Sequence, residues 1–197
     1  MSALVEQLNE DLSEVVARAR VGLVQIHNGH RGAGAGAVWH PDGLIVTNAH
    51  VVQRRRPQVV LADGRTVSAR LLAADPDHDL AALEVDATGL PAVTLGASRR
   101  LRPGQWVVAV GHPWGIAGAA TVGVVIGLGA DLPGFPAGRG EMLALSLHLR
   151  PGHSGGVVVD ESGQVVGINT MMAGPDVGLA IPVEVAKRFI KDALGTP

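Results

Sequence analysis

Apolar positions near the N-terminus recur at helical spacing, with acidic residues between them. The members of this stripe are Leu4, Val5, Leu8, Leu12, Val15 and Val16. Spacings of three and four residues place such side chains on one face of a helix, and Ser2 can cap its start. The pattern therefore predicts one amphipathic helix over residues 3–18.

Beyond residue 20 the helical period gives way to short apolar runs bounded by turn residues. The first set of runs lies at 21–26, 35–39, 44–47, 58–61, 67–72 and 80–85, and the second at 106–110, 119–128, 142–149, 156–159, 164–169 and 177–181. Turn sequences such as His40-Pro41-Asp42-Gly43 and Glu161-Ser162-Gly163 separate neighbouring runs. Many short strands with few helices predict an all-β sandwich or a pair of barrels, and not a βαβ fold. A final amphipathic helix is expected over residues 183–195.

The composition is that of a chain able to bury a core. Of its 197 residues 47% are hydrophobic, and the net charge of -2 gives no reason to expect nucleic acid as a partner. There is no cysteine, so neither disulfides nor thiol chemistry are expected. The apolar stretch at 107–130 is broken by several glycines, so no membrane span is predicted, and the N-terminus lacks the pattern of a signal peptide.

The most informative segment is Gly152-His153-Ser154-Gly155-Gly156, which lies between two apolar runs. Glycines on both sides of Ser154 expose its hydroxyl and free backbone N–H groups to converge on a developing negative charge. Acyl transfer needs both features, which makes Ser154 a candidate nucleophile. Such a serine also requires a general base and an acid that orients the base.

His50 is the candidate base among the eight histidines. It closely follows the apolar run 44–47, at a strand end where catalytic side chains are often displayed. His153 is adjacent to Ser154, and adjacent residues of a turn point apart, so it is a poor base for that serine. His112, between Gly111 and Pro113, is interpreted as a turn residue.

Three carboxylates share one loop and compete for the role of the orienting acid: Asp75, Asp77 and Asp79. Their spacing alone does not choose among them. Asp79 enters an apolar strand, where an unpaired carboxylate is costly to bury, so it is favoured as the partner of an imidazole.

These residues belong to five segments that together resemble the sequential landmarks of the HtrA/Deg serine proteases, which have the chymotrypsin fold. The segments are Thr47-Asn48-Ala49-His50-Val51-Val52, Asp75-Pro76-Asp77-His78-Asp79-Leu80-Ala81, Pro151-Gly152-His153-Ser154-Gly155-Gly156, Gly167-Ile168-Asn169-Thr170 and Gly178-Leu179-Ala180-Ile181-Pro182. All five occur in the family's order, from about residue 20 to the C-terminus. The resemblance implies two six-stranded antiparallel β-barrels.

The resemblance also implies a single protease domain without a PDZ domain. Its expected parts are an N-terminal helix at 1–18, a first barrel at 19–95, a second barrel at 105–182 and a C-terminal helix at 183–195. Because about fifteen residues follow Ile181, the chain is expected to be either a truncated piece or a member that lacks this domain.

By the same resemblance, His50 is the base, Asp79 the orienting acid and Ser154 the nucleophile. The backbone of Gly152, His153 and Ser154 is expected to form the oxyanion hole, with the N–H groups of Gly152 and Ser154 as donors. The chemistry requires no metal ion and no cofactor, and none is predicted.

A substrate pocket follows from the resemblance as well. Its expected base and walls are His148, Leu149, Thr170, Met171, Met172, Gly178 and Ala180. No Asp lies at the base, so cleavage after Lys or Arg is not expected. Leu149 and the two methionines favour aliphatic side chains, although the methionines could equally be core filler.

The expected function is that of a serine endopeptidase that cleaves exposed apolar segments of unfolded or misfolded polypeptides in protein quality control. The resemblance further implies a homotrimer and a place outside the cytoplasm, in the periplasm or beyond it. His153 stands where the family usually has Asn or Asp, and residues 146–150 depart from the family's usual approach to the serine. These departures motivate an alternative, a catalytically silent chymotrypsin-fold module that binds polypeptides or acts like a chaperone.

Two further hypotheses are weaker. The run from Gly32 to Ala37 loosely resembles a dinucleotide-binding glycine loop, but a strand follows it and not a long helix. The simpler interpretation is a glycine-rich turn or strand that passes close to a neighbour. A lipase or esterase of the α/β-hydrolase type would need the chain order Ser, Asp, His, which is not the order here.

Overall fold

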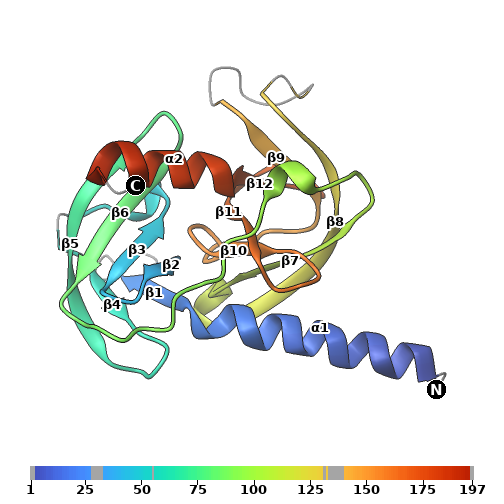
Figure 1. Cartoon of the computed structure of the whole chain (residues 1–197), viewed down its shortest axis with the longest axis horizontal. Coiled ribbons are helices and arrows are strands. Elements are labelled where there is room, and N and C mark those ends of the chain that lie inside the picture. The colour runs from blue at the N-terminus through green and yellow to red at the C-terminus, as the bar shows by residue number, and fades with distance from the viewer. Residues whose placement is uncertain (1–2, 28–32, 55, 131, 133–139, 196–197) are drawn as a thin grey trace.

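The computed structural model describes residues 3–27, 33–54, 56–130, 132 and 140–195. The chain runs from helix α1 through two closed six-stranded barrels to helix α2 (Figure 1). The first barrel has the strand order β1-β2-β3-β6-β5-β4, and all its neighbouring strands are antiparallel. Its strands are β1 (Leu23–His27), β2 (Ala33–His40), β3 (Leu44–Thr47), β4 (Gln58–Val60), β5 (Thr66–Asp75) and β6 (Leu80–Val85).

The second barrel repeats this antiparallel design with the order β10-β11-β12-β9-β8-β7. Its strands are β7 (Trp106–Gly111), β8 (Ala119–Gly129), β9 (Met142–Ser146), β10 (Val157–Val159), β11 (Val165–Gly174) and β12 (Val177–Pro182). Closure leaves neither sheet with a free edge strand. The predicted fold class, two six-stranded antiparallel barrels with a helix at each end, is confirmed.

Helix α1 spans Ala3–Val21 and extends three residues beyond its predicted end. Ala19 continues the buried face that begins at Val15, so the last turn still packs on the body of the protein against β7 and β10. The first half of α1 projects away from the barrels (Figure 1), and Leu4, Val5 and Leu8 are exposed there. No helix in the described part of the chain is both long and apolar enough to cross a membrane.

Helix α2 spans Val183–Leu194 and ends at Gly195, which adopts a left-handed conformation (φ +63°). This is the usual way for glycine to stop a helix. The helix packs against β11 and β12 of the second barrel and also against β5 and β6 of the first. It therefore ties the two barrels together.

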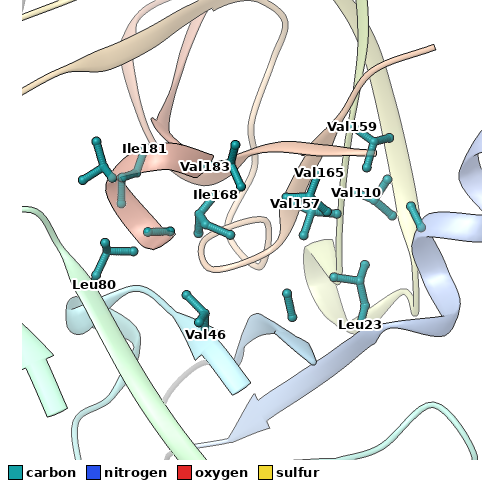
Figure 2. Close-up of a cluster of buried hydrophobic side chains, with 14 of the residues drawn as sticks. Leu23, Val46, Leu80, Val110, Val157, Val159, Val165, Ile168, Ile181 and Val183 are labelled. Carbon is teal, nitrogen blue, oxygen red and sulfur yellow. The ribbon is translucent and has the colours of Figure 1, made fainter. Parts of the chain in front are cut away.

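Alternation along the strands divides the apolar residues among three packed clusters. In β10, Val158 faces the interior of the second barrel, whereas Val157 and Val159 belong to a separate cluster between the barrels. Figure 2 shows this central cluster, in which Val46 and Leu80 of the first barrel approach residues of β10, β11 and β12. Because this shared core fixes one barrel on the other, it also positions any site built from both.

Candidate active site

His50 lies in a short 3₁₀ helix, η1 (Ala49–Val51), which follows β3 after one residue. The segment is anchored to the loop before β6. Both the Ala49 N–H and the buried side-chain amide of Asn48 donate to the Asp79 carbonyl oxygen, each at 3.1 Å. The backbone around His50 is therefore positioned by the residue whose carboxylate its ring faces.

Asp79 is buried and immediately precedes β6, in a backbone conformation with φ of +55°. Its carboxylate accepts the His50 backbone N–H at 3.0 Å and lies 2.8 Å from His50 Nδ1 through Oδ2. The Thr170 hydroxyl donates to Oδ2 at 2.6 Å. Burial alone would raise the pKa of Asp79, but the hydrogen bonds from His50 and Thr170 outweigh it and hold the pKa below its ordinary value. The carboxylate thus stays ionised and keeps a proton on Nδ1 of His50.

The other two carboxylates of this loop do not face His50. Asp75 accepts the backbone N–H groups of Asp77 and His78 and lies 2.7 Å from the His78 ring. Asp77 is exposed. The structure therefore brings Asp79, alone among the three, to the candidate base.

Ser154 occupies a turn between the barrels, and Gly155 follows it with φ of +79°. A Cβ at Gly155 would lie 2.1 Å from the Ala35 carbonyl oxygen of β2, so only glycine fits this approach. Ala35 also donates its N–H to the Ser154 carbonyl oxygen at 2.8 Å. The glycine-rich segment of the first barrel is thus a strand that contacts the serine turn, although Gly32 lies outside the described residues.

The Ser154 hydroxyl donates to the Thr170 carbonyl oxygen at 3.0 Å. Thr170 therefore contacts both halves of the candidate triad, because its side chain holds Asp79 and its backbone holds Ser154. Among the described residues no hydrogen bond joins Ser154 to His50. The hydroxyl must rotate from the Thr170 carbonyl before it can meet the ring.

The turn before Ser154 presents two backbone donors that are free within the described chain. His153 donates its N–H to the Arg150 carbonyl oxygen at 2.9 Å, and Gly152 has φ of +103° after Pro151, which is the pattern of a type II turn. The N–H groups of Gly152 and Ser154 make no hydrogen bond to described residues. The N–H of His153 lies between these two donors in the chain and closes the turn, in agreement with donors at Gly152 and Ser154 alone.

The connection from β7 to β8 supports this turn from behind. It includes a short 3₁₀ helix, η3 (Pro113–Gly115). The backbone N–H groups of His112 and Trp114 donate to the carbonyl oxygens of Gly152 (2.9 Å) and Pro151 (3.2 Å). The Arg150 guanidinium lies over the Trp114 ring, 5.5 Å from its centroid, at a distance typical of a cation–π contact. His112 is buried and lies in this β7–β8 connection, directly before η3.

The expected pocket residues separate into two groups. Leu149 is buried and its N–H approaches the Met172 sulfur at 3.1 Å, while a Cβ at Gly178 would touch both Leu149 and Leu147. Leu147 was not predicted, because its role depends on a strand about thirty residues away. Together these residues form a closely packed apolar wall beside the serine turn. Ala180 lies fully buried behind it.

The remaining pocket residues lie on other surfaces. Met171 and Thr170 line a cleft of about 540 Å³ together with His50, Asp79 and Pro76. His148 is exposed and approaches the Pro175 carbonyl oxygen at 3.1 Å through Nδ1. His148 therefore contacts the β11–β12 turn.

Two closed antiparallel barrels form a chymotrypsin-like fold, and the His–Asp pair on one barrel and the serine in a glycine-rich turn on the other form a candidate peptidase site. A sequence profile of the trypsin-like peptidase domain matches residues 34–168. The chain belongs to this trypsin-like peptidase family. Its relatives and structural neighbours include HtrA- and DegP-type proteases, which confirms the resemblance seen in the sequence.

Two curated relatives illustrate the similarity. The chain is 40% identical over 162 residues to a "Probable periplasmic serine endoprotease DegP-like" of Halomonas elongata, covering 79% of this chain and 34% of the relative. It is 39% identical over 165 residues to a protein of the same name from Brucella suis, covering 80% of this chain and 32% of the relative. The chain thus spans about a third of the length of these relatives.

Two solved structures are also similar to this chain. The "HtrA-type protease AlgW with decapeptide" superimposes with a TM-score of 0.84 at 26% identity, covering 93% of this chain and 67% of the other. A serine endoprotease from Yersinia pestis gives a TM-score of 0.81 at 29% identity, covering 92% of this chain and 66% of the other.

Proposed function

We propose that this chain is the catalytic part of a serine endopeptidase in which Ser154 is the nucleophile, His50 the general base and Asp79 the orienting acid. The observation that carries the proposal is the network that crosses the barrel junction. Asp79 holds Nδ1 of His50 at 2.8 Å and the Thr170 hydroxyl at 2.6 Å, and the Thr170 carbonyl accepts the Ser154 hydroxyl at 3.0 Å.

In this mechanism the Ser154 oxygen attacks the carbonyl carbon of a peptide bond while Nε2 of His50 accepts the hydroxyl proton. The Asp79 carboxylate fixes the proton on Nδ1, so that Nε2 carries the lone pair, and it stabilises the imidazolium that forms. The oxyanion that develops on the substrate accepts the N–H groups of Gly152 and Ser154. His50 then protonates the leaving amine, and water hydrolyses the acyl-enzyme by the same steps in reverse order.

The proposed substrates are exposed apolar segments of unfolded polypeptide. The wall formed by Leu147, Leu149 and Met172 is apolar and carries no charge, which suits an aliphatic side chain before the cleaved bond. Protein quality control follows as the proposed role, because such segments are exposed when a protein is misfolded.

The experiment compares the wild type with Ser154→Ala and His50→Ala. We expect the wild type to cleave casein and to react with a fluorophosphonate probe, and we expect both variants to lose casein cleavage. A wild type that neither cleaves nor labels at any pH between 6 and 9, while its circular dichroism shows a folded chain, would overturn the proposal.

One observation favours the alternative, a catalytically silent module that binds unfolded polypeptide. The Ser154 hydroxyl is hydrogen-bonded to Thr170 and not to His50. The same comparison separates the two functions, because a silent module would bind a labelled unfolded polypeptide equally well with and without Ser154 but would never react with the probe. In a protease, by contrast, the hydroxyl rotates to His50 once substrate fills the cleft.

We also propose that the protein forms a homotrimer through the projecting half of α1. Leu4, Val5 and Leu8 are exposed there, and a stripe of leucines facing solvent is costly unless another copy covers it. Light scattering should give three times the chain mass for the wild type and one chain mass for Leu4→Glu/Leu8→Glu. A wild type that stays monomeric at the highest soluble concentration would contradict this assembly.

A further inference from the structure

The residue before the candidate nucleophile, His153, is almost completely buried, with 1% of its surface exposed. It does not project toward the cleft that contains His50. It packs inward against β7, where a Cβ at Gly111 would lie 2.8 Å from the His153 Cα and 3.4 Å from its Cδ2. A histidine that packs against the barrel, on the side of the turn away from the cleft, requires a structural explanation.

The ring of His153 is bound to the backbone of Arg150, the first residue of the type II turn. Nδ1 lies 3.1 Å from the Arg150 nitrogen and 3.2 Å from its carbonyl oxygen. The backbone N–H of His153 donates to that same carbonyl at 2.9 Å. The main chain and the side chain of His153 thus both bind the backbone of Arg150 and close the turn.

The other ring nitrogen has no hydrogen-bond partner among the described residues. Nε2 of His153 is buried and makes no hydrogen bond to any described residue. A protonated ring would place a second N–H in this apolar space, and it would turn the Nδ1 proton toward the Arg150 N–H. Burial therefore lowers the pKa of His153; the contact of the ring with the Arg150 carbonyl opposes this shift without reversing it, and the Arg150 charge lowers the pKa further. The ring is neutral, and its Nδ1 can accept the Arg150 N–H.

We propose that His153 is a positioning residue for the oxyanion hole. Its neutral Nδ1 holds Arg150, and this contact fixes the turn that directs the N–H groups of Gly152 and Ser154 to one point. The proposal rests on the function proposed above. In this proposal the oxyanion hole is stabilised by residues of the same chain, because His153 contacts the turn and β7.

The geometry suggests a conservative replacement. In asparagine, Oδ1 is separated from Cα by the same number of bonds as Nδ1 in histidine, so it can accept the Arg150 N–H from the same place. Glutamine carries its oxygen one methylene further out and cannot reach that place without displacing the turn. Leucine fills the space but accepts nothing. His153→Asn should therefore preserve the hole, while His153→Gln and His153→Leu should not.

The test measures kcat and KM separately on a fluorogenic peptide with valine before the cleaved bond. We expect His153→Leu and His153→Gln to lower kcat on the order of 100-fold, the cost of losing one oxyanion donor, with KM changed less than about 3-fold. We expect His153→Asn to stay within about 5-fold of the wild type. Thermal unfolding identifies any variant that fails to fold. If His153→Leu fails to fold, His153→Gln still tests the proposal, because it keeps a polar side chain at this position.

The outcomes separate this inference from the proposed function. Equal kcat in all four proteins would overturn the positioning role while leaving the protease intact. An inactive wild type would overturn the protease, and the ring can then be examined directly by ¹⁵N NMR of the histidines in Ser154→Ala. A neutral His153 ring supports the contact. So does a backbone amide signal of Arg150 that shifts in His153→Leu but keeps its position in His153→Asn. A ring that is protonated at pH 7 contradicts it.

Discussion

At the scale of single residues, Thr170 has a larger role than its sequence position suggests. It is the sixth residue of β11 and the last of the segment Gly167-Ile168-Asn169-Thr170, but no local feature of the chain indicates a contact with Asp79. Its contact with Asp79 spans 91 residues and its contact with Ser154 spans 16. Such contacts follow from the packing of one barrel on the other, so the sequence predicted Thr170 only as a pocket wall, through the family resemblance.

Thr170→Val should weaken both activity and stability. The substitution keeps the shape and the backbone carbonyl but removes the hydroxyl that donates to Asp79, so a buried carboxylate loses one hydrogen bond. We expect about 1–3 kcal/mol lower free energy of unfolding, measured with urea, and about 10-fold lower kcat because His50 is less firmly oriented. Thr66→Val, at an exposed position of β5, is the control and should change neither.

Met172→Ala should change specificity more than stability. Met172 packs its sulfur on the Leu149 N–H at the apolar wall, so a smaller side chain deepens the space beside the serine turn. We expect kcat/KM to rise about 10-fold for peptides with leucine or phenylalanine before the cleaved bond, relative to valine. Met142→Ala, in β9 at a distance from this wall, is a control that should leave the ratio unchanged. An unchanged ratio in Met172→Ala would show that substrate binds elsewhere.

Two buried histidines should make the protein less stable in mild acid. Burial lowers the pKa of His112 and of His153 below the ordinary value of 6.5. The unfolded chain therefore takes up protons first as the pH falls, and folding loses stability below about pH 6.5, by up to about 1.4 kcal/mol per pH unit for each ring. Urea unfolding at pH 7.5 and 5.0 measures this loss.

The comparison needs variants that lack one ring. His153→Asn should lose less stability over this interval than the wild type, whereas His40→Asn, at an exposed position, should lose the same amount. Asp79 acts in a lower range. Its pKa is held below the ordinary value, so its contribution is present above about pH 4 and disappears as the pH falls further. Equal losses in all three proteins between pH 7.5 and 5.0 would contradict the role of His153.

At the scale of elements, the contact between β2 and the serine turn decides how the site is assembled. The glycine-rich strand lies so close to the turn that the Ala35 backbone N–H donates a hydrogen bond to the Ser154 carbonyl oxygen. A Cβ at Gly155 would lie 2.1 Å from the Ala35 carbonyl oxygen, and a Cβ at Gly34 would lie 3.3 Å from the Ser154 carbonyl oxygen. A glycine run in a strand thus marks close backbone approach.

Gly155→Ala should therefore abolish activity. The added methyl group meets the Ala35 carbonyl and must also adopt φ of +79°, so the turn has to move away from β2. We expect a loss of more than about 2 kcal/mol in the free energy of unfolding and at least a 100-fold loss of kcat. Gly64→Ala is the matched control, since it has φ of +86° but open space around it, and should cost about 1 kcal/mol with full activity.

The helices and strands also show how much of the fold local sequence pattern can predict. Short apolar runs bounded by turn residues predicted each strand to within about five residues, and the two helices were found by their apolar faces. The end of α1 was missed by three residues, because the burial of Ala19 depends on tertiary packing of α1, which contacts β7 and β10, and not on the local pattern. The strand order that closes each barrel, with β1 paired to β4 in the first and β7 to β10 in the second, depends on pairings between distant segments.

At the scale of the whole molecule, the candidate site exists only while the two barrels are joined. His50 and Asp79 come from the first barrel, and Thr170 and Ser154 from the second. The central cluster in Figure 2 and helix α2 hold the barrels together. Val46 of the first barrel belongs to this cluster and is fully buried. Sequence motifs in family order predicted that these residues would meet, whereas the apolar contacts that bring them together carry no motif of their own.

Because the barrels share this core, they should unfold in a single cooperative step. The three tryptophans report on the barrels separately, since Trp39 lies in β2 of the first barrel and Trp106 and Trp114 lie on the second. Trp39→Phe leaves the reporters of the second barrel, and Trp106→Phe/Trp114→Phe leaves the reporter of the first. Within each variant, urea transitions followed by fluorescence and by far-ultraviolet circular dichroism should coincide, as two-state unfolding requires. Fluorescence that changes before the circular dichroism in one variant, and after it in the other, would show barrels that unfold independently. In that case loss of activity should follow the less stable barrel, because neither half carries the complete set of His, Asp and Ser.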